Sequence, residues 1–239
     1  MANTQIAVTI EPESLLNQTT KEQLILFQAS FDIIELRIDQ WEKAFTAQLI
    51  KALEALHALE LNKQILVTYR TLSQGGSGKL DEDEYMKLLT EIIQIDSVDM
   101  IDVEFDKSKF RDPLKALIAQ ANHKDIEVVL SYHDFQETPS LEELKHLYFK
   151  MHQLAPAYLK VAVMPNDKLD VIHLLEALAI TAEHVPQKAI GIAMSHLGIV
   201  SRTAQGLFGG SVSYGCLDEP KAPGQIHVER LKQLLEVYE

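Results

Sequence analysis

The chain has 239 residues, of which 46% are hydrophobic, and this is enough for one large domain with a substantial core. Its formal net charge of −13 and its pI near 5.1 argue against nucleic acid or an anionic membrane surface as a partner, because both require a basic face. The single cysteine, Cys216, allows no intramolecular disulfide. The sequence shows no leader-like N-terminus and no run of roughly 20 apolar residues. We therefore expect a cytoplasmic protein without a membrane span.

Short β-rich runs alternate with helical patterns along the chain. The expected strands span residues 6–10, 31–39, 64–71, 100–105, 125–135, 158–165, 188–195 and 211–217, and the expected helices span 20–30, 45–61, 81–95, 112–124, 140–154, 168–185, 197–209 and 226–239. Such alternation implies right-handed crossovers and a parallel sheet. Eight units without a second compositional block predict a closed (β/α)8 TIM barrel, as a single domain over residues 1–239, rather than an open doubly wound sheet.

Polar residues interrupt five neighbouring strands of this predicted barrel. Residues two apart in a strand share a face, and consecutive strands of a parallel barrel are neighbours. The polar residues that could converge at the C-terminal mouth are Glu35, Arg37 and Asp39, then Arg70, then Asp102 and Glu104, then Ser131 and His133, and finally Lys160. Any one pair could be an ordinary ion pair at the rim, but stability alone hardly explains such groups on five adjacent strands. The mouth is where barrel enzymes keep their active sites.

Lys160 lies inside the apolar run YLKVAVMP. It could extend to solvent or pair with Glu104. However, burial and neighbouring arginine side chains would disfavour the ammonium form and lower the pKa of the amine. A neutral amine in a mostly apolar pocket is what attack on a carbonyl and Schiff-base formation require. His133, on the adjacent strand, is the natural proton carrier because its unperturbed pKa is near neutrality.

Other motifs do not support a different chemistry. The segment QGGSGKL resembles part of a phosphate-binding P-loop, but it lacks the first glycine and the Ser or Thr after the lysine. The nine histidines show no metal-ligand spacing, so we expect no metal site.

Taken in order, ELRID, TYRT with QGG, DVEF, SYHDF, LKVAVMP, MSxxGxxSR and APGQ resemble the type I 3-dehydroquinate dehydratase family over nearly the whole chain. The resemblance implies a (β/α)8 barrel, usually a homodimer, that uses no cofactor or metal. It also implies that 3-dehydroquinate is the small-molecule substrate and loses water by syn elimination through a lysine Schiff base. The Schiff-base lysine of the family falls on Lys160, and its general acid/base falls on His133.

The resemblance further assigns a set of residues that would hold the substrate around this pair. They are Glu35, Arg37 and Arg70 for the ring hydroxyls, Arg202 for the carboxylate, Met194 for the apolar side of the ring, and Gln225 with the backbone near Ala222 for a closing loop. A bidentate arginine is the expected partner of a carboxylate.

Two positions depart from the family pattern. Better-known members have a glutamate that supports the histidine just before the Gly-Gly pair, and here that residue is Gln74. Gln74 cannot supply a negative charge, so the residues that could orient His133 are Glu104, Asp102 and Gln74 itself, and the sequence does not choose among them. In the closing loop, Lys221 stands where many relatives have a small serine.

Two other functions remain open at this level. A class I aldolase also carries a Schiff-base lysine on a barrel strand, and residues 208–215 could imitate its phosphate site. The arginine-rich rim with an APGQ loop suits a polyhydroxy carboxylate better. A non-catalytic barrel that binds a small acid is a third reading, which the Lys160 and His133 pair disfavours.

Overall fold

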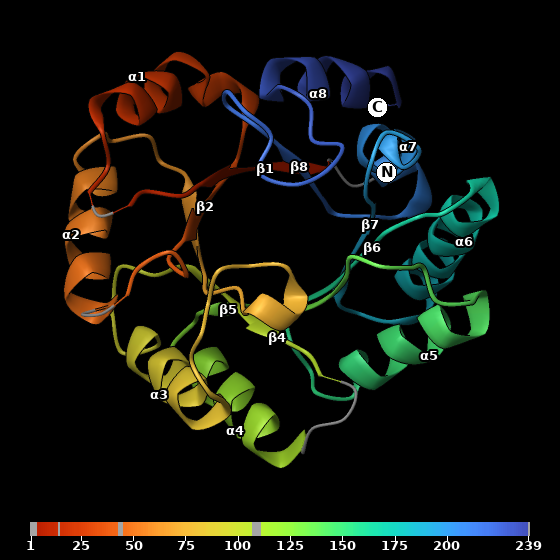
Figure 1. Cartoon of the computed structure of the whole chain (residues 1–239), viewed down its shortest axis with the longest axis horizontal. Coiled ribbons are helices and arrows are strands. Elements are labelled where there is room, and N and C mark those ends of the chain that lie inside the picture. The colour runs from red at the N-terminus through yellow and green to blue at the C-terminus, as the bar shows by residue number, and fades with distance from the viewer. Residues whose placement is uncertain (1–3, 14, 43–44, 107–110, 239) are drawn as a thin grey trace.

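Eight parallel strands form the centre of the molecule, and helices surround them (Figure 1). The computed structural model describes residues 4–13, 15–42, 45–106 and 111–238. The strands are β1 Gln5–Ile10, β2 Ile33–Arg37, β3 Gln64–Thr68, β4 Met100–Glu104, β5 Glu127–Asp134, β6 Tyr158–Val163, β7 Lys188–Ala193 and β8 Val212–Gly215. They are paired in the order β7-β6-β5-β4-β3-β2-β1-β8, so neighbours in sequence are neighbours in the sheet and the predicted barrel is confirmed.

Each strand is followed by a helix, as expected. The helices are α1 Gln18–Leu26, α2 Phe45–His57, α3 Glu82–Ile92, α4 Arg111–Asn122, α5 Leu141–His152, α6 Lys168–His184, α7 Ile199–Thr203 and α8 Val228–Leu235. Asp81, Ser140 and Asp167 begin α3, α5 and α6 with capping boxes, in which the cap and the third helical residue exchange hydrogen bonds. No helix in the described part of the chain is long and apolar enough to cross a membrane.

The helix expected over 197–209 is the one that differs clearly from the prediction. It forms only a five-residue α7 and a separate 3-10 turn over Gln205–Phe208. Gly206 lies within this turn, and Gly209 ends it in the left-handed conformation with φ 78°. Glycine is a poor helix former and readily adopts positive φ, so the segment bends back early towards β8.

Strand parity separates an apolar floor from a polar layer inside the barrel. The inward residues near the start of the strands are apolar and form one cluster, which includes Ala7, Ile33, Leu66, Met100, Val129, Tyr158, Ile190 and Val212. Two residues further along, the inward positions include Thr9, Glu35, Thr68, Asp102, Ser131 and Lys160, and all of these are buried. The alternate residues face outward into the larger core between sheet and helices. The polar groups therefore gather at the C-terminal end of the barrel.

The seam between β7 and β8 is closed largely by side chains. Gln205, which is fully buried, accepts from the backbone N–H of Gly191 on β7 at 3.3 Å and donates to the carbonyl of Val212 on β8 at 2.9 Å. Nearby, the backbone N–H of Ser211 donates to the carbonyl of Ala189 at 2.8 Å, beside an isolated bridge. The amide of Gln205 thus stands in for a missing pair of ladder hydrogen bonds.

Replacing Gln205 with alanine should destabilise the fold. The change leaves a buried N–H and a buried C=O without partners, and each such group costs about 1–3 kcal/mol. We expect the free energy of unfolding, measured by urea denaturation, to fall by about 2–4 kcal/mol. Gln120→Ala is the matched control, because Gln120 is exposed on α4. Equal stability of the two variants would contradict the role of Gln205 at the seam.

Candidate active site

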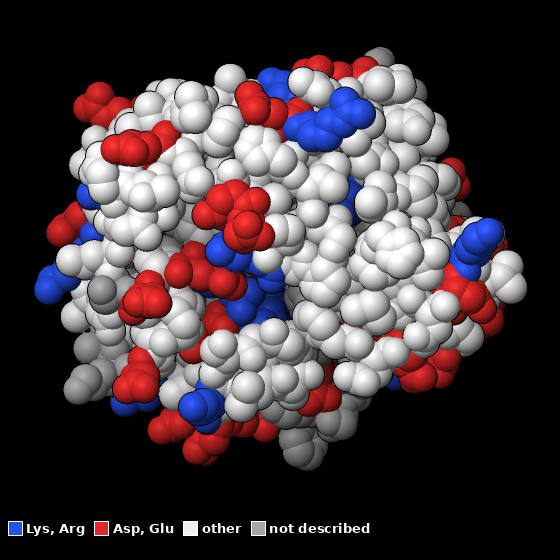
Figure 2. Space-filling view, turned by 45° about the horizontal axis from the view of Figure 1, so that its top comes forward, with Lys and Arg blue, Asp and Glu red and all other residues white. Residues whose placement is uncertain are grey.

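A small cavity opens at the C-terminal ends of the strands, with a volume of about 100 Å³. It is lined by Thr9, Glu35, Arg37, Arg70, Gln74, Gly75, His133, Phe135, Lys160, Ala162, Ile192, Met194, Arg202, Tyr214, Lys221, Ala222 and Gln225. Figure 2 shows a hollow near the middle of the face turned to the viewer, with Lys and Arg atoms inside it and Asp and Glu atoms along one side. The cavity brings together Lys160, His133 and every substrate-binding residue predicted from the sequence.

Lys160 is only 4% exposed, and its amine is surrounded rather than hydrogen-bonded. Its Nζ lies 3.8 Å from Oε1 of Glu35, 3.9 Å from Oδ2 of Asp102, and 4.1 Å from the ring centroid of Tyr214. None of these contacts is within hydrogen-bond distance. Lys160 does not pair with Glu104, the partner considered from sequence, because Glu104 is bound to Arg70 and Thr71.

The pKa of Lys160 is lowered from its ordinary value of 10.5. Burial is the main cause, because removing an ammonium from water disfavours the charged form. Glu35 and Asp102 oppose the shift, while Arg70 and Arg37 add to it. The lysine is therefore closer to the neutral, nucleophilic amine than an exposed lysine would be.

Glu35 is held as a carboxylate by its hydroxyl neighbours. Thr9 Oγ1 donates to its Oε2 at 2.7 Å, and Thr68 Oγ1 donates to its Oε1 at 3.0 Å. Burial raises the pKa of Glu35, but the charges of Lys160 and Arg37 and the hydrogen bond from Thr9 outweigh it, and the net pKa is lowered. The carboxylate is thus charged and has fixed geometry.

The guanidinium of Arg37, beside Glu35 on β2, forms a fork with Asp39. Its Nε and Nη2 donate to the two carboxylate oxygens at 2.6 and 2.8 Å, and its Nη1 lies 3.3 Å from Glu11. Asp39 also accepts from the backbone N–H groups of Arg70 and Ser77, at 3.2 and 2.9 Å. Arg37 therefore lines the cavity, while Asp39, predicted on the same face, anchors the loop after β3.

Arg70 joins the two acidic residues of β4. Its Nη2 lies 2.8 Å from Oδ1 of Asp102, and its Nη1 donates to Oε1 of Glu104 at 3.1 Å and to Oγ of Ser131 at 2.9 Å. Thr71 completes the shell of Glu104 by donating from its backbone N–H and its hydroxyl at 2.8 and 2.7 Å. Burial lowers the pKa of Arg70, but the two carboxylates outweigh it and raise the net value.

His133 is oriented by Gln74, and neither of the two acidic candidates hydrogen-bonds to it. Oε1 of Gln74 accepts from the backbone N–H of His133 at 2.9 Å and lies 3.2 Å from its Nδ1. Nε2 of Gln74 donates to the carbonyl of Phe105 at 3.3 Å, which fixes the orientation of the amide. Of the three candidates considered from the sequence, Gln74 makes this contact, whereas the carboxylates of Glu104 and Asp102 are bound to Arg70.

This amide also selects the tautomer of His133. An amide oxygen only accepts, so Nδ1 must carry the proton, and the lone pair is left on Nε2. The pKa of His133 lies well below 6.5, first because of burial and then because of the cations Arg70, Lys160 and Arg37. The ring is thus a neutral base held in one tautomer.

The turn that carries Gln74 depends on a glycine. Residues Leu72–Gln74 form a 3-10 turn that ends at Gly75 in the left-handed conformation with φ 82°. A β-carbon at Gly75 would collide with the ring of Phe135, which stacks on His133 with a centroid distance of 6.5 Å. The QGG sequence therefore positions the partner of the histidine and does not form a nucleotide loop.

Arg202, at the end of α7, is 1% exposed and has no carboxylate partner within the described residues. Its Nη1 and Nη2 donate to the carbonyls of Tyr214 and Pro223 at 3.3 and 3.0 Å, and its Nε is buried without a hydrogen-bond partner. Burial lowers the pKa of Arg202 to about 10. This is a charged group with an unused donor beside the cavity.

The loop over residues 217–225 covers one side of the cavity. Oε1 of Gln225 accepts from the backbone N–H groups of Lys221 and Ala222 at 2.7 and 3.3 Å. The backbone N–H of Ser195 donates to the carbonyl of Pro223 at 3.2 Å, which ties the loop to the end of β7. Gln225 is buried and lines the cavity.

Tyr214 is a site residue that the sequence reasoning missed. It lies on β8, is 4% exposed and presents its ring to Lys160. Thr9 on β1 was also missed, although it donates to Glu35. Both have the inward parity of their strands, and this parity was the signal that could have found them.

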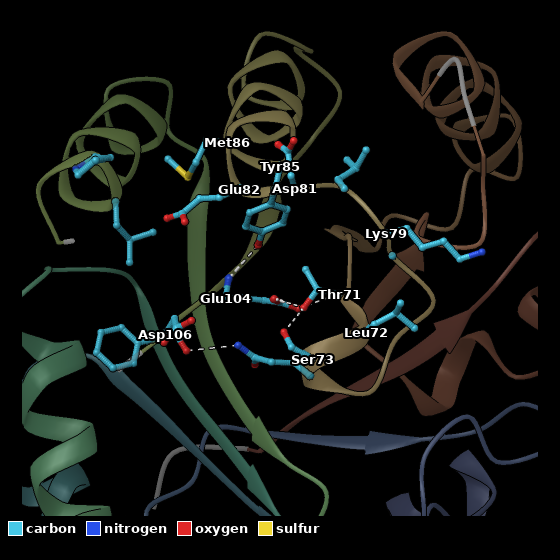
Figure 3. Close-up of a pocket in the computed structure, with 16 residues that line it drawn as sticks. Thr71, Leu72, Ser73, Lys79, Asp81, Glu82, Tyr85, Met86, Glu104 and Asp106 are labelled. Carbon is cyan, nitrogen blue, oxygen red and sulfur yellow. Dashed lines mark hydrogen bonds between the residues drawn. The ribbon is translucent and has the colours of Figure 1, made fainter. Parts of the chain in front are cut away.

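A larger cavity of about 390 Å³ lies next to the candidate site (Figure 3). Thr71 and Ser73 point towards Glu104 in this cavity, and the hydroxyl of Tyr85 accepts from the backbone N–H of Glu104 at 2.9 Å. Its lining contains neither the buried lysine nor the histidine. Gln74 lines both cavities and Glu104 lines only the larger one, whereas Lys160 and His133 line the smaller one.

The glycine pair considered for an aldolase-type phosphate site is not at the mouth. Gly209 and Gly210 lie before β8, whereas the mouth is formed by the loops that follow the strands. Gly210 packs against the side chain of Gln205 at the barrel seam. Residues 208–215 are therefore part of the barrel wall.

Comparison with known proteins gives consistent results over the whole chain. A family model described as Type I 3-dehydroquinase matches residues 6–239. The 3-dehydroquinate dehydratase of Staphylococcus saprophyticus is 54% identical over 239 residues, covering 100% of both chains, and that of Staphylococcus carnosus is 52% identical, covering 100% of this chain and 99% of the relative.

Solved structures show the same similarity. A type I 3-dehydroquinate dehydratase from Clostridium difficile, with covalently modified comenic acid, has a TM-score of 0.90 and 30% identity, covering 100% of this chain and 93% of the other. The 3-dehydroquinate dehydratase from Enterococcus faecalis has a TM-score of 0.84 and 27% identity, covering 100% and 95%.

The contact with Gln74 makes a prediction about the titration of His133. A carboxylate beside the ring favours imidazolium, so Gln74→Glu should raise the pKa of His133 from its value below 6.5 by about one unit or more. Histidine-labelled NMR titrations would measure this, with the resonance assigned by its loss in His133→Ala. Gln120→Glu adds the same charge on the exposed face of α4 and should leave the His133 titration unchanged. An identical pKa in Gln74→Glu and the unaltered protein would show that the amide does not govern the ring.

Proposed function

The chain belongs to the type I 3-dehydroquinase family, and we propose that Lys160 and His133 perform the chemistry of its reaction. It is a hydro-lyase that converts 3-dehydroquinate to 3-dehydroshikimate and water. Type I enzymes work through a Schiff base between a lysine and the substrate ketone. The observation that carries the assignment is the buried amine of Lys160, which has a lowered pKa and lies in one cavity with a neutral histidine.

The neutral amine of Lys160 would attack the ketone, and the resulting carbinolamine would take up one proton from solvent and lose water to leave an iminium. The positive nitrogen withdraws electrons and acidifies the adjacent C–H. His133 would take that proton at Nε2, giving an enamine, and then return it to the hydroxyl that departs as water when the enamine electrons expel it. Hydrolysis of the remaining imine would release the enone and restore the amine. Each proton that His133 accepts is thus given back within the cycle.

Arg202 is the proposed partner of the substrate carboxylate. It is a buried cation without a carboxylate among the described residues, and its unused Nε lies beside a cavity that also contains the proposed nucleophile. A bidentate pair with the substrate would satisfy that donor. Since the protein has a net charge of −13, long-range attraction cannot bring an anion to the site, and the affinity must come from such a short-range contact.

The remaining lining residues would hold the ring. Glu35, Arg37 and Arg70 present fixed charged groups to hydroxyls at one side of the cavity, and Met194 presents an apolar surface. Gln225 and the backbone near Ala222 would close over the substrate from the loop after β8. The well-anchored carboxylates and guanidinium groups need little reorganisation on binding.

We also propose that the chain is one domain and acts as a homodimer in the cytoplasm. These proposals rest on the family resemblance, on the single barrel formed by the described residues and on the lone cysteine. Sedimentation equilibrium of the purified protein should give twice the 26.9 kDa of the chain, and a monomer at all concentrations would contradict the dimer.

Covalent trapping tests the assignment of the nucleophile. Borohydride reduction in the presence of substrate or product should add the mass of the reduced ligand to a peptide that contains Lys160, because an imine becomes a stable amine. Lys160→Ala should abolish both the label and turnover. Lys168→Ala, at an exposed site at the start of α6, should retain both.

The same assay separates the two proposed roles. His133→Ala should lose about 10²-fold or more in turnover, the usual scale for a general acid/base, while Lys160 can still be labelled. A label on another lysine would refute the role of Lys160. Near-normal turnover of His133→Ala would refute that of His133.

The carboxylate site makes a separate prediction. Arg202→Lys keeps the charge but loses the planar fork, so the apparent affinity for substrate should fall clearly, and Arg202→Ala should lower it further, by a few kcal/mol at most on the scale of charged hydrogen bonds. Steady-state kinetics would measure both, with circular dichroism as the folding control. Unchanged affinity in Arg202→Ala would move the carboxylate to Arg37, Arg70 or Lys221.

A further inference from the structure

One carboxylate oxygen in the polar layer has no hydrogen-bond donor. Asp102 is 0% exposed, and its Oδ1 accepts from Oγ of Ser131 at 2.7 Å and lies 2.8 Å from Nη2 of Arg70. Its Oδ2 is buried and has no hydrogen-bond partner among the described residues. A buried carboxylate oxygen left without a donor is costly, and such an atom in a native site calls for a physical reason.

The free oxygen is directed at the proposed nucleophile. Oδ2 of Asp102 lies 3.9 Å from Nζ of Lys160, beyond hydrogen-bond distance but close enough for strong charge interaction. The other carboxylate near this amine, Glu35, is different because both of its oxygens already accept threonine hydroxyls. Of these two acids, Asp102 alone has an oxygen with no donor.

We propose that Asp102 is the counter-ion and hydrogen-bond acceptor of the iminium that Lys160 forms with the substrate. This rests on the proposed function. Once the iminium has formed, its nitrogen bears one hydrogen and a full positive charge in a cavity of about 100 Å³. Oδ2 of Asp102 is the unpaired acceptor available to that N–H, and its negative charge stabilises the cation.

The surrounding shell explains why Asp102 stays in place before the imine forms. Arg70 and Ser131 hold Oδ1, so the carboxylate cannot turn away from Lys160 without losing an ion pair and a hydrogen bond. Tyr214, on β8, presents the face of its ring to the amine of Lys160. This contact favours any cation at the nitrogen. The site is therefore arranged for a positive nitrogen while leaving the free amine unbonded.

Asp102→Asn removes the charge and keeps the shape, so it tests the proposal directly. With saturating 3-dehydroshikimate, which would form the imine from the product side, the fraction of Lys160 trapped by borohydride should fall at least about tenfold. The pH at which trapping rises should move downwards as well, because Asp102 raises the pKa of the amine. The other charged or titratable groups near Lys160 are Glu35, Arg37, Arg70, His133 and Tyr214, and they are unchanged in this variant.

Glu104→Gln is the matched control. It removes a carboxylate from the same strand and from the same arginine, but Glu104 is not among the groups near the amine of Lys160. This variant should retain the trapped fraction and the pH of trapping, even if substrate affinity changes. A general defect of the barrel would lower trapping in both variants without the downward pH shift.

The unaltered protein offers a test that does not depend on the folding of a variant. In a crystal structure of the borohydride-reduced or imine complex, Nζ of Lys160 should lie within 3.5 Å of Oδ2 of Asp102. A nitrogen hydrogen-bonded to Glu35 or water instead would overturn the proposal, as would equal trapping in Asp102→Asn. If the unaltered protein is not labelled at Lys160 at all, the proposed function fails instead.

Discussion

A lysine amine inside the barrel is the constraint on which the rest of the site depends. Lys160 lies in the middle of β6, directly above an apolar floor, where an isolated ammonium would be strongly disfavoured. The carboxylates of Glu35 on β2 and Asp102 on β4 offset that charge. Two buried carboxylates require positive partners in turn, and Arg37 and Arg70 supply them. The buried amine of Lys160 thus accounts for the two carboxylates near it, and these carboxylates account for the two arginines.

Arg202, which also lines the cavity, has no carboxylate partner among the described residues. Arg37 makes two hydrogen bonds to one carboxylate, and Arg70 forms ion pairs with two carboxylates. The guanidinium of Arg202 donates to backbone carbonyls instead. The cavity of a strongly acidic protein therefore contains a buried cation that no carboxylate among the described residues neutralises. An anionic ketone would suit both proposed contacts, because its carboxylate would pair with the guanidinium of Arg202 while its carbonyl would meet the amine of Lys160.

Much of this arrangement follows from strand parity, and the part that does not follow depends on turns and on the barrel seam. The alternation along β2 to β6 predicted which polar side chains converge, and Lys160 stands out as a charge in an apolar run. The sequence left the partner of His133 open among Glu104, Asp102 and Gln74, because the choice depends on a short 3-10 turn, ending at Gly75 with positive φ, that brings Gln74 to the ring. Gln205 looked like an ordinary helical residue, and only the gap between β7 and β8 explains its burial.

The neutral partner of His133 has a chemical consequence for the whole site. A carboxylate next to the ring would strengthen the base but would also favour imidazolium, adding a fourth cation near Arg37, Arg70 and Lys160. An amide fixes the same tautomer without adding charge. In the proposed reaction, the positive charge of the iminium would then be left to the carboxylates around Lys160, while the histidine would stay neutral until it took a proton from the substrate. Lys160 and His133 therefore share Arg37 and Arg70 as cationic neighbours, but Glu35 and Asp102 act on the amine while Gln74 contacts the ring.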